Sequence, residues 1–266
     1  MTTNPYMGSS LDDLLEEDRV LEEIDAIALK RVLAWQVQEL MPEKGLTTLP
    51  DAIIKRQLEE WAIAMIQAIP KLLTFEEFLE WYPEDGRYEL IDGQVIEMQP
   101  TGKHEEIAEF LDAELTLETR RLQLPYRFPK HAILKATSFN TGYLPDVLVV
   151  NRNALSTEPL WEKAATITFG SSVPLVVEVV STNWENDYAR KLEDYETMGI
   201  REYWIVDYLG LGGRRYIGSP KQPTLSIYQL VEGEYQVNLF RGNDPIRSLT
   251  FPELELTVQQ VFQGER

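Results

Sequence analysis

The stretch PLVVEVVST, residues 174–182, places one carboxylate inside a nearly continuous apolar run. A short apolar run of this kind predicts a β-strand that is covered on both faces of its sheet. Glu178 lies in the middle of that strand, where an unpaired charge would cost several kcal/mol. We therefore expect the strand to belong to the core and Glu178 to have a partner that offsets the cost of its burial.

A second acid, Asp146, stands directly behind Pro145 in YLPDVLVV, another run with the pattern of a buried strand. Two acids on strands that are near neighbours along the chain suggest a shared divalent cation, and hydrogen-bonded structural acids are the alternative. Mg²⁺ takes one or two carboxylates together with water and phosphate oxygens. Side chains alternate along a strand, so the carbonyl of Val179 remains available as a further oxygen ligand. We predict Asp146, Glu178 and Val179 as metal ligands.

Lys191 is the candidate catalytic cation. It lies in a helix expected over residues 186–197, on the same face as Asp187 and Asp194. The connection from the preceding strand is short enough for Lys191 to fold back over the end of the sheet. There it would orient an attacking water or offset negative charge on the reacting phosphate. The alternative is a solvated lysine that pairs with Asp187 or Asp194.

The composition narrows the choice of metal. The chain has 266 residues and no cysteine, which excludes disulfides, a thiolate zinc site and a cysteine nucleophile. Its two histidines, His104 and His131, are too few for most zinc enzymes. The expected cofactor is therefore an ion with oxygen ligands, Mg²⁺, with Mn²⁺ as the alternative.

The charge of the chain bears on its partners. A net charge of −19 argues against a general polyanion binder, because phosphate contacts need Lys and Arg. A local basic groove can nevertheless coexist with an acidic exterior. Arg214 and Arg215, in a Gly-rich loop, are candidates for phosphate contact, with a solvated loop as the alternative. Tyr195 and Trp204 are expected to be core aromatics.

No segment has the pattern of a transmembrane helix. The longest uncharged run, residues 164–177, has 14 residues and contains Gly170 and Pro174. A spanning helix needs about 20 apolar residues. The N-terminal segment also lacks the basic region and apolar core of a secretory signal. We expect no membrane partner and a cytoplasmic location.

From residue 74 onward the sequence alternates helix and strand patterns. Thr74 and Glu77 have the spacing of a capping box, and Asp92-Gly93 between two alternating runs predicts a hairpin with a type I′ turn. The other expected elements are helices over residues 103–123 and 186–197, strands near residues 131–136, 144–151, 174–181 and 202–207, and a second hairpin over residues 224–240. This order is typical of a mixed α/β domain.

Two domains are expected, an all-helical extension over residues 1–70 and the mixed α/β domain over residues 71–266. Apolar residues recur with helical spacing in two stripes of the extension, which begin at Leu21 and Ile54. Packing against a partner helix or against the main domain explains such stripes.

The extension also has a weak resemblance to a DNA-binding module. Residues 4–18 and 26–47 are similar to the start of bacterial helix-turn-helix antitoxins of the Xre type. The following LPDAIIKRQ lacks the small-residue turn and the polar recognition helix that would enter a major groove. On this reading the segment is a remnant that no longer reads DNA.

The acids, the lysine and their flanking segments resemble a known family. Asp146 behind its proline, Glu178 in VVEVVS and Lys191 in the next helix, followed by GIREYWIVD and preceded by YELIDGQVIEM, are similar to the family named "putative restriction endonuclease" in the PD-(D/E)xK nuclease superfamily. The resemblance covers residues 73–262. It implies a restriction-endonuclease-like fold, in which helices flank a mixed central sheet and metal-dependent phosphodiester cleavage occurs at one end.

The resemblance also bears on three individual positions. In the basic pattern of the superfamily the lysine stands two residues after the Glu, but Val180 occupies that place here. In this family the lysine is displaced to the next helix, where Lys191 lies. Glu89 matches an upstream acid that completes or supports the metal shell, with pairing across its hairpin as the alternative. His104 matches a histidine at the start of a helix, with a local hydrogen bond as its alternative.

Residues and resemblance together predict a cytoplasmic, Mg²⁺-dependent endonuclease that hydrolyses phosphodiester bonds of DNA. Its predicted catalytic residues are Asp146, Glu178, Lys191 and Glu89. A homodimer is expected, because cutting both strands usually needs two sites. The alternative is a catalytically inactive protein with the nuclease fold, which serves as an oligomerisation or regulatory module related to toxin–antitoxin systems.

Overall fold

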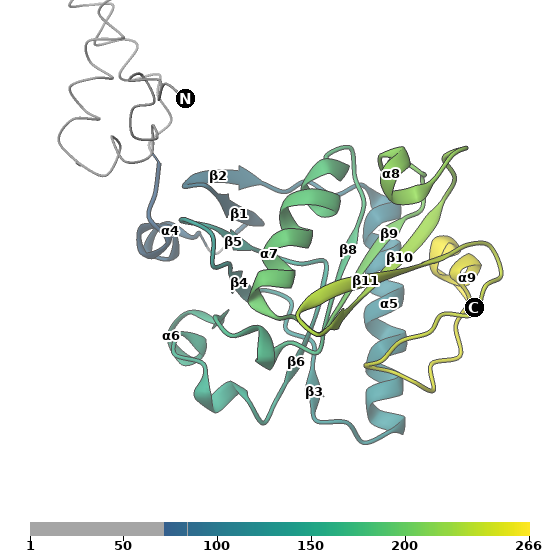
Figure 1. The fold of residues 1–266 in the computed structure, drawn as a ribbon. Coiled ribbons are helices and arrows are strands. Elements are labelled where there is room, and N and C mark those ends of the chain that lie inside the picture. Colours follow the sequence, from purple (N-terminus) through teal and green to yellow (C-terminus); the bar gives the residue numbers. More distant parts are fainter. Residues whose placement is uncertain (1–71, 84) are drawn as a thin grey trace, which may run out of the picture. The chain divides into compact units, whose positions relative to one another are not determined.

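The computed structural model describes residues 72–83 and 85–266 (Figure 1). The predicted helical extension over residues 1–70, with its apolar stripes and its Xre-like segment, lies outside the described residues. The boundary after residue 70 and the regulatory alternative therefore stay predictions. In the described part of the chain, no helix combines the length and the apolar character needed to cross a bilayer.

The smaller of the two sheets in the described ranges has five short strands. In spatial order they are β2 (Gln94–Glu97), β1 (Tyr88–Ile91), β5 (Gly142–Tyr143), β4 (Ile133–Lys135) and β7 (Thr166–Ile167). Neighbouring strands are antiparallel except β4 and β7, which run parallel. The β1–β2 hairpin turns at Asp92 and Gly93, whose φ angles are 50° and 79°. Both angles are positive, as the predicted type I′ turn requires.

The larger sheet contains the buried strand that carries Glu178. Its six strands, in spatial order, are β11 (Glu234–Phe240), β10 (Thr224–Val231), β9 (Glu202–Asp207), β8 (Leu175–Val179), β6 (Val147–Asn151) and β3 (Tyr126–Arg127). β8 is antiparallel to β6, with Val177 opposite Val147, and parallel to β9, with Val177 opposite Trp204. All residues of β8 are buried, so the predicted strand with both faces covered is confirmed.

Some of the helices begin at a threonine whose side chain caps the first turn, and others have no side-chain cap. They are α4 (Phe75–Trp81), α5 (Gly102–Arg121), α6 (Trp161–Ala164), α7 (Lys191–Met198), α8 (Arg214–Ile217) and α9 (Val258–Gln263), with the 3₁₀ turns η1 (Leu155–Thr157) and η2 (Gly170–Ser172) and the π-helical turn η3 (Asn186–Arg190). Thr74 and Glu77 form the predicted capping box of α4. Thr101 caps α5 by accepting a hydrogen bond from the backbone N–H of His104.

The larger sheet separates two apolar clusters. Val177 and Trp204 pack on one face with α5 and α9. Val176 and Ile205 pack on the opposite face with η3, α7 and strands of the smaller sheet. Figure 1 shows α7 and α5 on opposite faces of the sheet. Because side chains alternate along β8, Glu178 belongs to the face covered by α7.

The expected fold class, mixed α/β with helices around a mixed sheet, is confirmed, but the strands divide between two sheets. The helix expected over residues 186–197 begins as η3 and continues as α7, which ends at Gly199 with a φ of 76°. Strands β3, β5 and β7 and helices α6, α8 and α9 were not expected, so Arg214 and Arg215 form the first turn of a short helix within the expected loop. Strands of two residues are too short to show a periodic pattern. Their pairing depends on partners that are distant in the sequence.

Gly170 generates a prediction about packing. A Cβ atom at Gly170 would lie 2.1 Å from the carbonyl oxygen of Met198, at the end of α7. Gly170→Ala is expected to lower the melting temperature by roughly 5 °C, because overpacking costs about 1–3 kcal/mol and each kcal/mol shifts the melting temperature by about 2–4 °C in a domain of this size. Gly102→Ala is the control, since a Cβ there would meet no atom within 4 Å. Equal melting temperatures for wild type and Gly170→Ala in a thermal scan would contradict this packing.

Candidate active site

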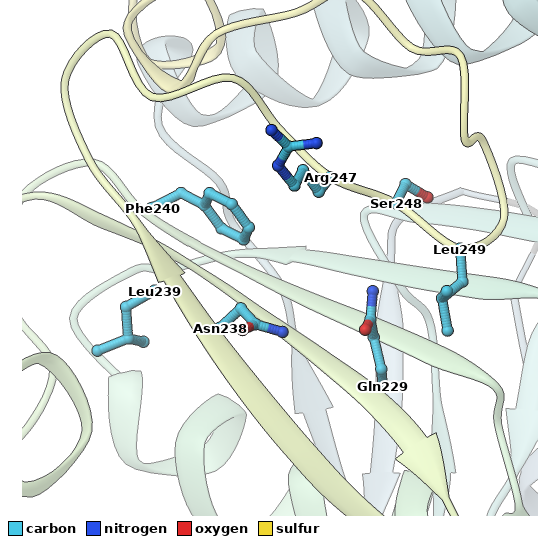
Figure 2. A pocket seen from close by; sticks show the side chains of 7 residues that line it. All are labelled: Gln229, Asn238, Leu239, Phe240, Arg247, Ser248 and Leu249. Atoms are coloured by element: carbon cyan, nitrogen blue, oxygen red, sulfur yellow. The ribbon is translucent and has the colours of Figure 1, made fainter.

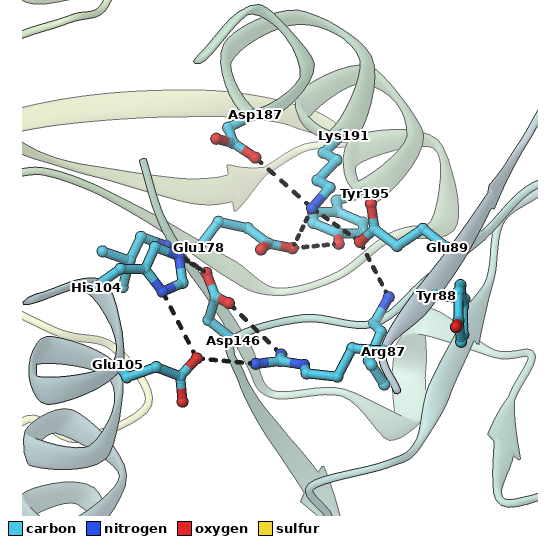
Figure 3. A network of polar contacts seen from close by, with 12 residues as sticks. Arg87, Tyr88, Glu89, His104, Glu105, Asp146, Glu178, Asp187, Lys191 and Tyr195 are labelled. Atoms are coloured by element: carbon cyan, nitrogen blue, oxygen red, sulfur yellow. Dashed lines mark hydrogen bonds and ion pairs between the residues drawn. The ribbon is translucent and has the colours of Figure 1, made fainter. Parts of the chain in front are cut away.

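The residues predicted from the sequence meet at one cavity, where β8 ends. Its volume is about 360 Å³. The charged and titratable residues that line it are Glu89, His104, Asp146, Glu178, Asp187 and Lys191. They come from β1, the start of α5, the residue before β6, β8, η3 and the start of α7 (Figure 3). Segments far apart in the sequence therefore build a single site.

The ammonium group of Lys191 is the centre of its charge network. Its Nζ atom lies 3.0 Å from Glu89 Oε1 and 3.2 Å from Glu178 Oε1 (Figure 3). Asp187 Oδ1, one helical turn earlier, lies 3.6 Å away. Asp194, the other partner considered, instead accepts hydrogen bonds from two hydroxyl groups. Only 4% of the Lys191 side chain is exposed, so Lys191 is not solvated, although the pairing with Asp187 that the alternative named is present.

Tyr195 orients the carboxylate of Glu178. Its hydroxyl donates a hydrogen bond of 2.8 Å to Glu178 Oε1, and it follows Lys191 by one turn of α7. One helix face thus supplies both contacts to the same oxygen. Tyr195 is buried in the core, as expected, but packing alone does not account for this hydrogen bond. Trp204 is also a core residue, and its indole N–H donates to Glu202 Oε1 at 2.8 Å.

Glu89 connects the smaller sheet to the network. Its Oε1 atom accepts a hydrogen bond from the backbone N–H of Leu144 at 3.1 Å, in addition to its contact with Lys191. Across the hairpin, Glu89 faces the apolar residue Ile96. Glu89 is thus paired across its hairpin with Ile96, as the alternative proposed, but its carboxylate also contacts Lys191 of α7.

Asp146 is held by a second set of partners. His104 Nε2 lies 3.1 Å from Asp146 Oδ2, and the backbone N–H of Val179 donates to the same oxygen at 2.8 Å. The guanidinium of Arg87 lies 3.6 Å from Asp146 Oδ1 and 3.2 Å from Glu105 Oε1 (Figure 3). Asp146 Oδ1 is buried and accepts no hydrogen bond from any described residue. One oxygen of Asp146 thus orients the side chain, and the other has capacity for a ligand.

Burial and neighbouring charges set the protonation of the Lys191 network. Burial raises the pKa of Glu178 well above its ordinary value, although the charge of Lys191 opposes this. Burial likewise raises the pKa of Asp187 to about 7, against the opposing charge of Lys191. Burial would lower the pKa of Lys191, but the surrounding carboxylates, with Glu178 foremost, outweigh it and raise that pKa well above its ordinary value. Lys191 is therefore charged at neutral pH.

His104 and Asp146 form a charge-assisted pair. Burial would lower the pKa of His104, but the hydrogen bond and the charge of Asp146 outweigh it, so the pKa of His104 is raised. Burial would raise the pKa of Asp146, but His104 reverses this and the pKa is lowered. Asp146 is thus an ionised carboxylate at neutral pH. The local hydrogen bond to Thr101 accounts for the backbone N–H of His104 but not for its ring.

The donor atoms fit an ion that takes few protein ligands. No group of three His, Asp or Glu side chains in the described ranges has the arrangement of a closed metal site. Mg²⁺ needs only one or two carboxylates besides water and phosphate oxygens. Asp146 Oδ1 is a buried oxygen to which none of the described residues donates a hydrogen bond, and Glu178 and Val179 line the same cavity. These oxygen donors suit Mg²⁺ or Mn²⁺ better than Zn²⁺.

Arg87 and Asp187 belong to the site, although the sequence pattern predicts a catalytic role for neither. Asp187 precedes Lys191 by four residues, and this helical spacing is a signal that could have identified it. Arg87 had no comparable signal. It reaches Asp146 only because the β1–β2 hairpin of the smaller sheet lies beside the end of the larger sheet.

A second cavity of about 370 Å³ lies between the β10–β11 hairpin and the segment before α9 (Figure 2). Its lining residues are Gln229, Asn238, Leu239, Phe240, Arg247, Ser248 and Leu249. This lining contains no carboxylate. The second cavity therefore lacks the acids that a metal-dependent hydrolysis requires.

Two comparisons with known proteins both find a putative nuclease. The model of the Uma2 family, described as "Putative restriction endonuclease", matches residues 75–259, a range that contains all four predicted catalytic residues. A crystal structure of "a putative nuclease belonging to DUF820" from Anabaena variabilis ATCC 29413 is similar in fold, with a TM-score of 0.55 and 17% identity over 72% of this chain and 98% of that chain. At this identity the likeness concerns the fold alone. No curated protein matches the chain.

The His104–Asp146 pair generates a prediction about pH. Because the folded-state pKa of His104 lies above its unfolded value of about 6.5, the pair contributes stability below that value and loses it as pH rises through the folded-state pKa. His104→Gln keeps a neutral donor at the place of Nε2. Its melting temperature in EDTA should fall below wild type by roughly 4–8 °C at pH 5.5, for about 2 kcal/mol of charged hydrogen bond, and by less at pH 9.

The control for this prediction is His131→Gln, since His131 is exposed. Its melting temperature should follow wild type at both pH values. A deficit of His104→Gln that is larger at pH 9 than at pH 5.5 would contradict the charged pair.

Proposed function

The chain belongs to the Uma2 family, described as "Putative restriction endonuclease", and on this premise we propose that it is an endonuclease that hydrolyses phosphodiester bonds of DNA with Mg²⁺ or Mn²⁺. The observation that carries the proposal is the distance of 3.2 Å between Lys191 Nζ and Glu178 Oε1. Val180 stands where a lysine would follow the acid on the strand itself. Instead, Lys191 at the start of α7 brings its ammonium group to the carboxylate of Glu178.

We assign the metal to Asp146, Glu178 and the carbonyl of Val179. Asp146 supports this role because its lowered pKa keeps it ionised and its Oδ1 atom accepts no hydrogen bond from the described residues. A bound Mg²⁺ would lower the pKa of a water molecule and polarise the scissile phosphate. Before the ion binds, Lys191 compensates the charge of Glu178.

Lys191 is proposed to act as a fixed positive charge. Its raised pKa keeps it protonated at neutral pH, so it orients the substrate or the water and stabilises developing negative charge, and does not accept a proton. Asp187 has a pKa of about 7 and lines the same cavity. A carboxylate of this pKa is suited to accept a proton from the attacking water near neutral pH. Glu89 and Tyr195 are positioning residues for Lys191 and Glu178.

The family description supports DNA as the substrate, which is part of the proposal. The cytoplasmic location and the homodimer stay predictions from the sequence. A cut through both strands of a duplex would require two such cavities, which is the reason to expect the dimer.

The acids can be tested by isosteric variants. Asp146→Asn and Glu178→Gln should each reduce the nicking rate of supercoiled plasmid by at least about 100-fold, because each removes a charged metal ligand. Glu193→Gln is the matched control, since Glu193 is exposed on α7 and does not line the cavity. Wild-type cleavage rates in either site variant, with unchanged melting temperatures, would show that the site is assigned wrongly.

The metal and the lysine can be tested in the same assay. Nicking should require Mg²⁺ or Mn²⁺ and stop in EDTA, and persistent cleavage in EDTA would contradict the metal. Lys191→Met should abolish nicking and also destabilise the protein by roughly 3–5 kcal/mol, because it leaves buried carboxylates without their cation. Lys163→Met, at an exposed lysine of α6, is the control for both readouts. RNA of the same sequence as a second substrate would show whether DNA is preferred.

A further inference from the structure

One wall of the cavity continues into a segment that carries positive charge only. Residues 208–231 contain no Asp or Glu, although the chain as a whole has a net charge of −19. Tyr208 and Leu209 line the cavity, and Arg214, Arg215 and Lys221 follow them. We call these three basic residues the α8 cation cluster. All three side chains are exposed.

Buried and partly buried hydrogen bonds fix the loop that carries this cluster. Asp207, the last residue of β9, accepts hydrogen bonds from the backbone N–H groups of Leu211 and Gly212 at 2.9 and 2.8 Å. Gly212 lies so close to Tyr188 that a Cβ atom there would be 2.8 Å from the Tyr188 ring. At the far end of α8, the guanidinium of Arg241 donates to the carbonyl of Ile217 at 2.7 Å. Both ends of the loop are therefore tied to the core.

Aromatic rings next to the cavity support the cations. The guanidinium carbon of Arg215 lies 4.4 Å from the ring centre of Tyr216, and Lys221 Nζ lies 5.6 Å from the ring centre of Trp184. Tyr216 in turn stacks on the buried Tyr188, with ring centres 5.0 Å apart. Such contacts hold a cation in place and leave its charge uncompensated.

The α8 cation cluster has no acidic partner. Among the residues that the structure describes, none of Arg214, Arg215 and Lys221 lies within ion-pair distance of a carboxylate. Lys221 Nζ donates to the carbonyl of Leu211 at 2.7 Å, which adds no negative charge. Lys191, which also lines the cavity, is instead paired with Glu89 and Glu178. The cluster is thus the place beside the cavity where positive charge is available to a ligand.

We propose that the α8 cation cluster binds the phosphate backbone of the nucleic-acid strand whose scissile phosphodiester lies in the cavity. The inference rests on the proposed nuclease function and names the surface that holds its substrate. Arg and Lys contacts to phosphates provide most of the sequence-independent affinity for nucleic acids and fix the register of the strand. The rest of the chain repels a polyanion, so the cluster also directs the strand to this end of the sheet. Figure 1 shows α8 at the end of the sheet where α5 begins, the end that holds the cavity.

The test compares two triple variants of the full chain with equal changes of charge. The first removes the cluster, Arg214→Ala, Arg215→Ala and Lys221→Ala. The control removes three exposed arginines at the opposite end of the elements that border the cavity, Arg120→Ala, Arg152→Ala and Arg201→Ala. The probe is a fluorescein-labelled 20-base-pair DNA duplex, measured by anisotropy in EDTA so that binding is observed without cleavage. Melting temperatures verify that both variants are folded.

The cluster variant should bind the duplex at least 10-fold more weakly than wild type, and the control should bind like wild type. The slope of log affinity against log salt concentration should become shallower by about 2 to 3, as expected when about three phosphate contacts are lost. Equal affinity of wild type and the cluster variant, or no binding by wild type at all, would overturn the inference.

Binding and cleavage separate this inference from the function on which it rests. If wild type cleaves plasmid with Mg²⁺ and the cluster variant has an unchanged KM and affinity, the inference fails and the nuclease function stands. If wild type binds the duplex through the cluster and cleaves no nucleic acid with Mg²⁺ or Mn²⁺, the binding surface stands and the nuclease function fails.

Discussion

Three buried carboxylates share the ammonium group of Lys191, and the arrangement of the two sheets around the candidate active site depends on this pairing. Glu89, Glu178 and Asp187 all lie within 3.6 Å of Lys191 Nζ. Each carboxylate would be costly to bury alone, and the loss of the lysine would leave all three uncompensated. The contacts also join β1 of the smaller sheet to β8 of the larger sheet through α7. One ionic cluster therefore links the two sheets and assembles the candidate active site.

The charged residues have different effects over the whole chain, inside the cavity and beside it. The excess of acids gives the chain a net charge of −19, and fewer than half of the lysines and arginines in the described part are paired with an acid. At the cavity, burial strengthens each interaction, so pKa values are shifted in opposite directions within a few ångströms. Asp146 stays ionised, while Asp187 has a pKa of about 7. Beside the cavity, the α8 cation cluster has no acidic partner among the described residues. Its positive charge is therefore available to the polyanion that we propose as its ligand.

Local features of the fold could be predicted because neighbours in sequence determine them. The capping box at Thr74 and the turn at Asp92-Gly93 each depend on two or three residues, and the structure contains both. The apolar run around Glu178 similarly predicted a strand covered on both faces. The division of the strands between two sheets could not be predicted in this way. It depends on pairings such as Leu90 with Gly142, which no local pattern records.

For the site, the sequence by itself determined which residue types meet there: acids inside apolar strands and a lysine in the next helix, in a chain that has no cysteine to offer a thiolate. A charge in an apolar run is informative because its burial requires compensation. Only the tertiary structure decided the partners. It placed Lys191 against Glu178, although Val180 lacks a charge, and it brought Arg87 and His104 to Asp146. Electrostatic contacts act through space, so they depend on how helices and sheets pack, whereas sequence spacing constrains only contacts within one element.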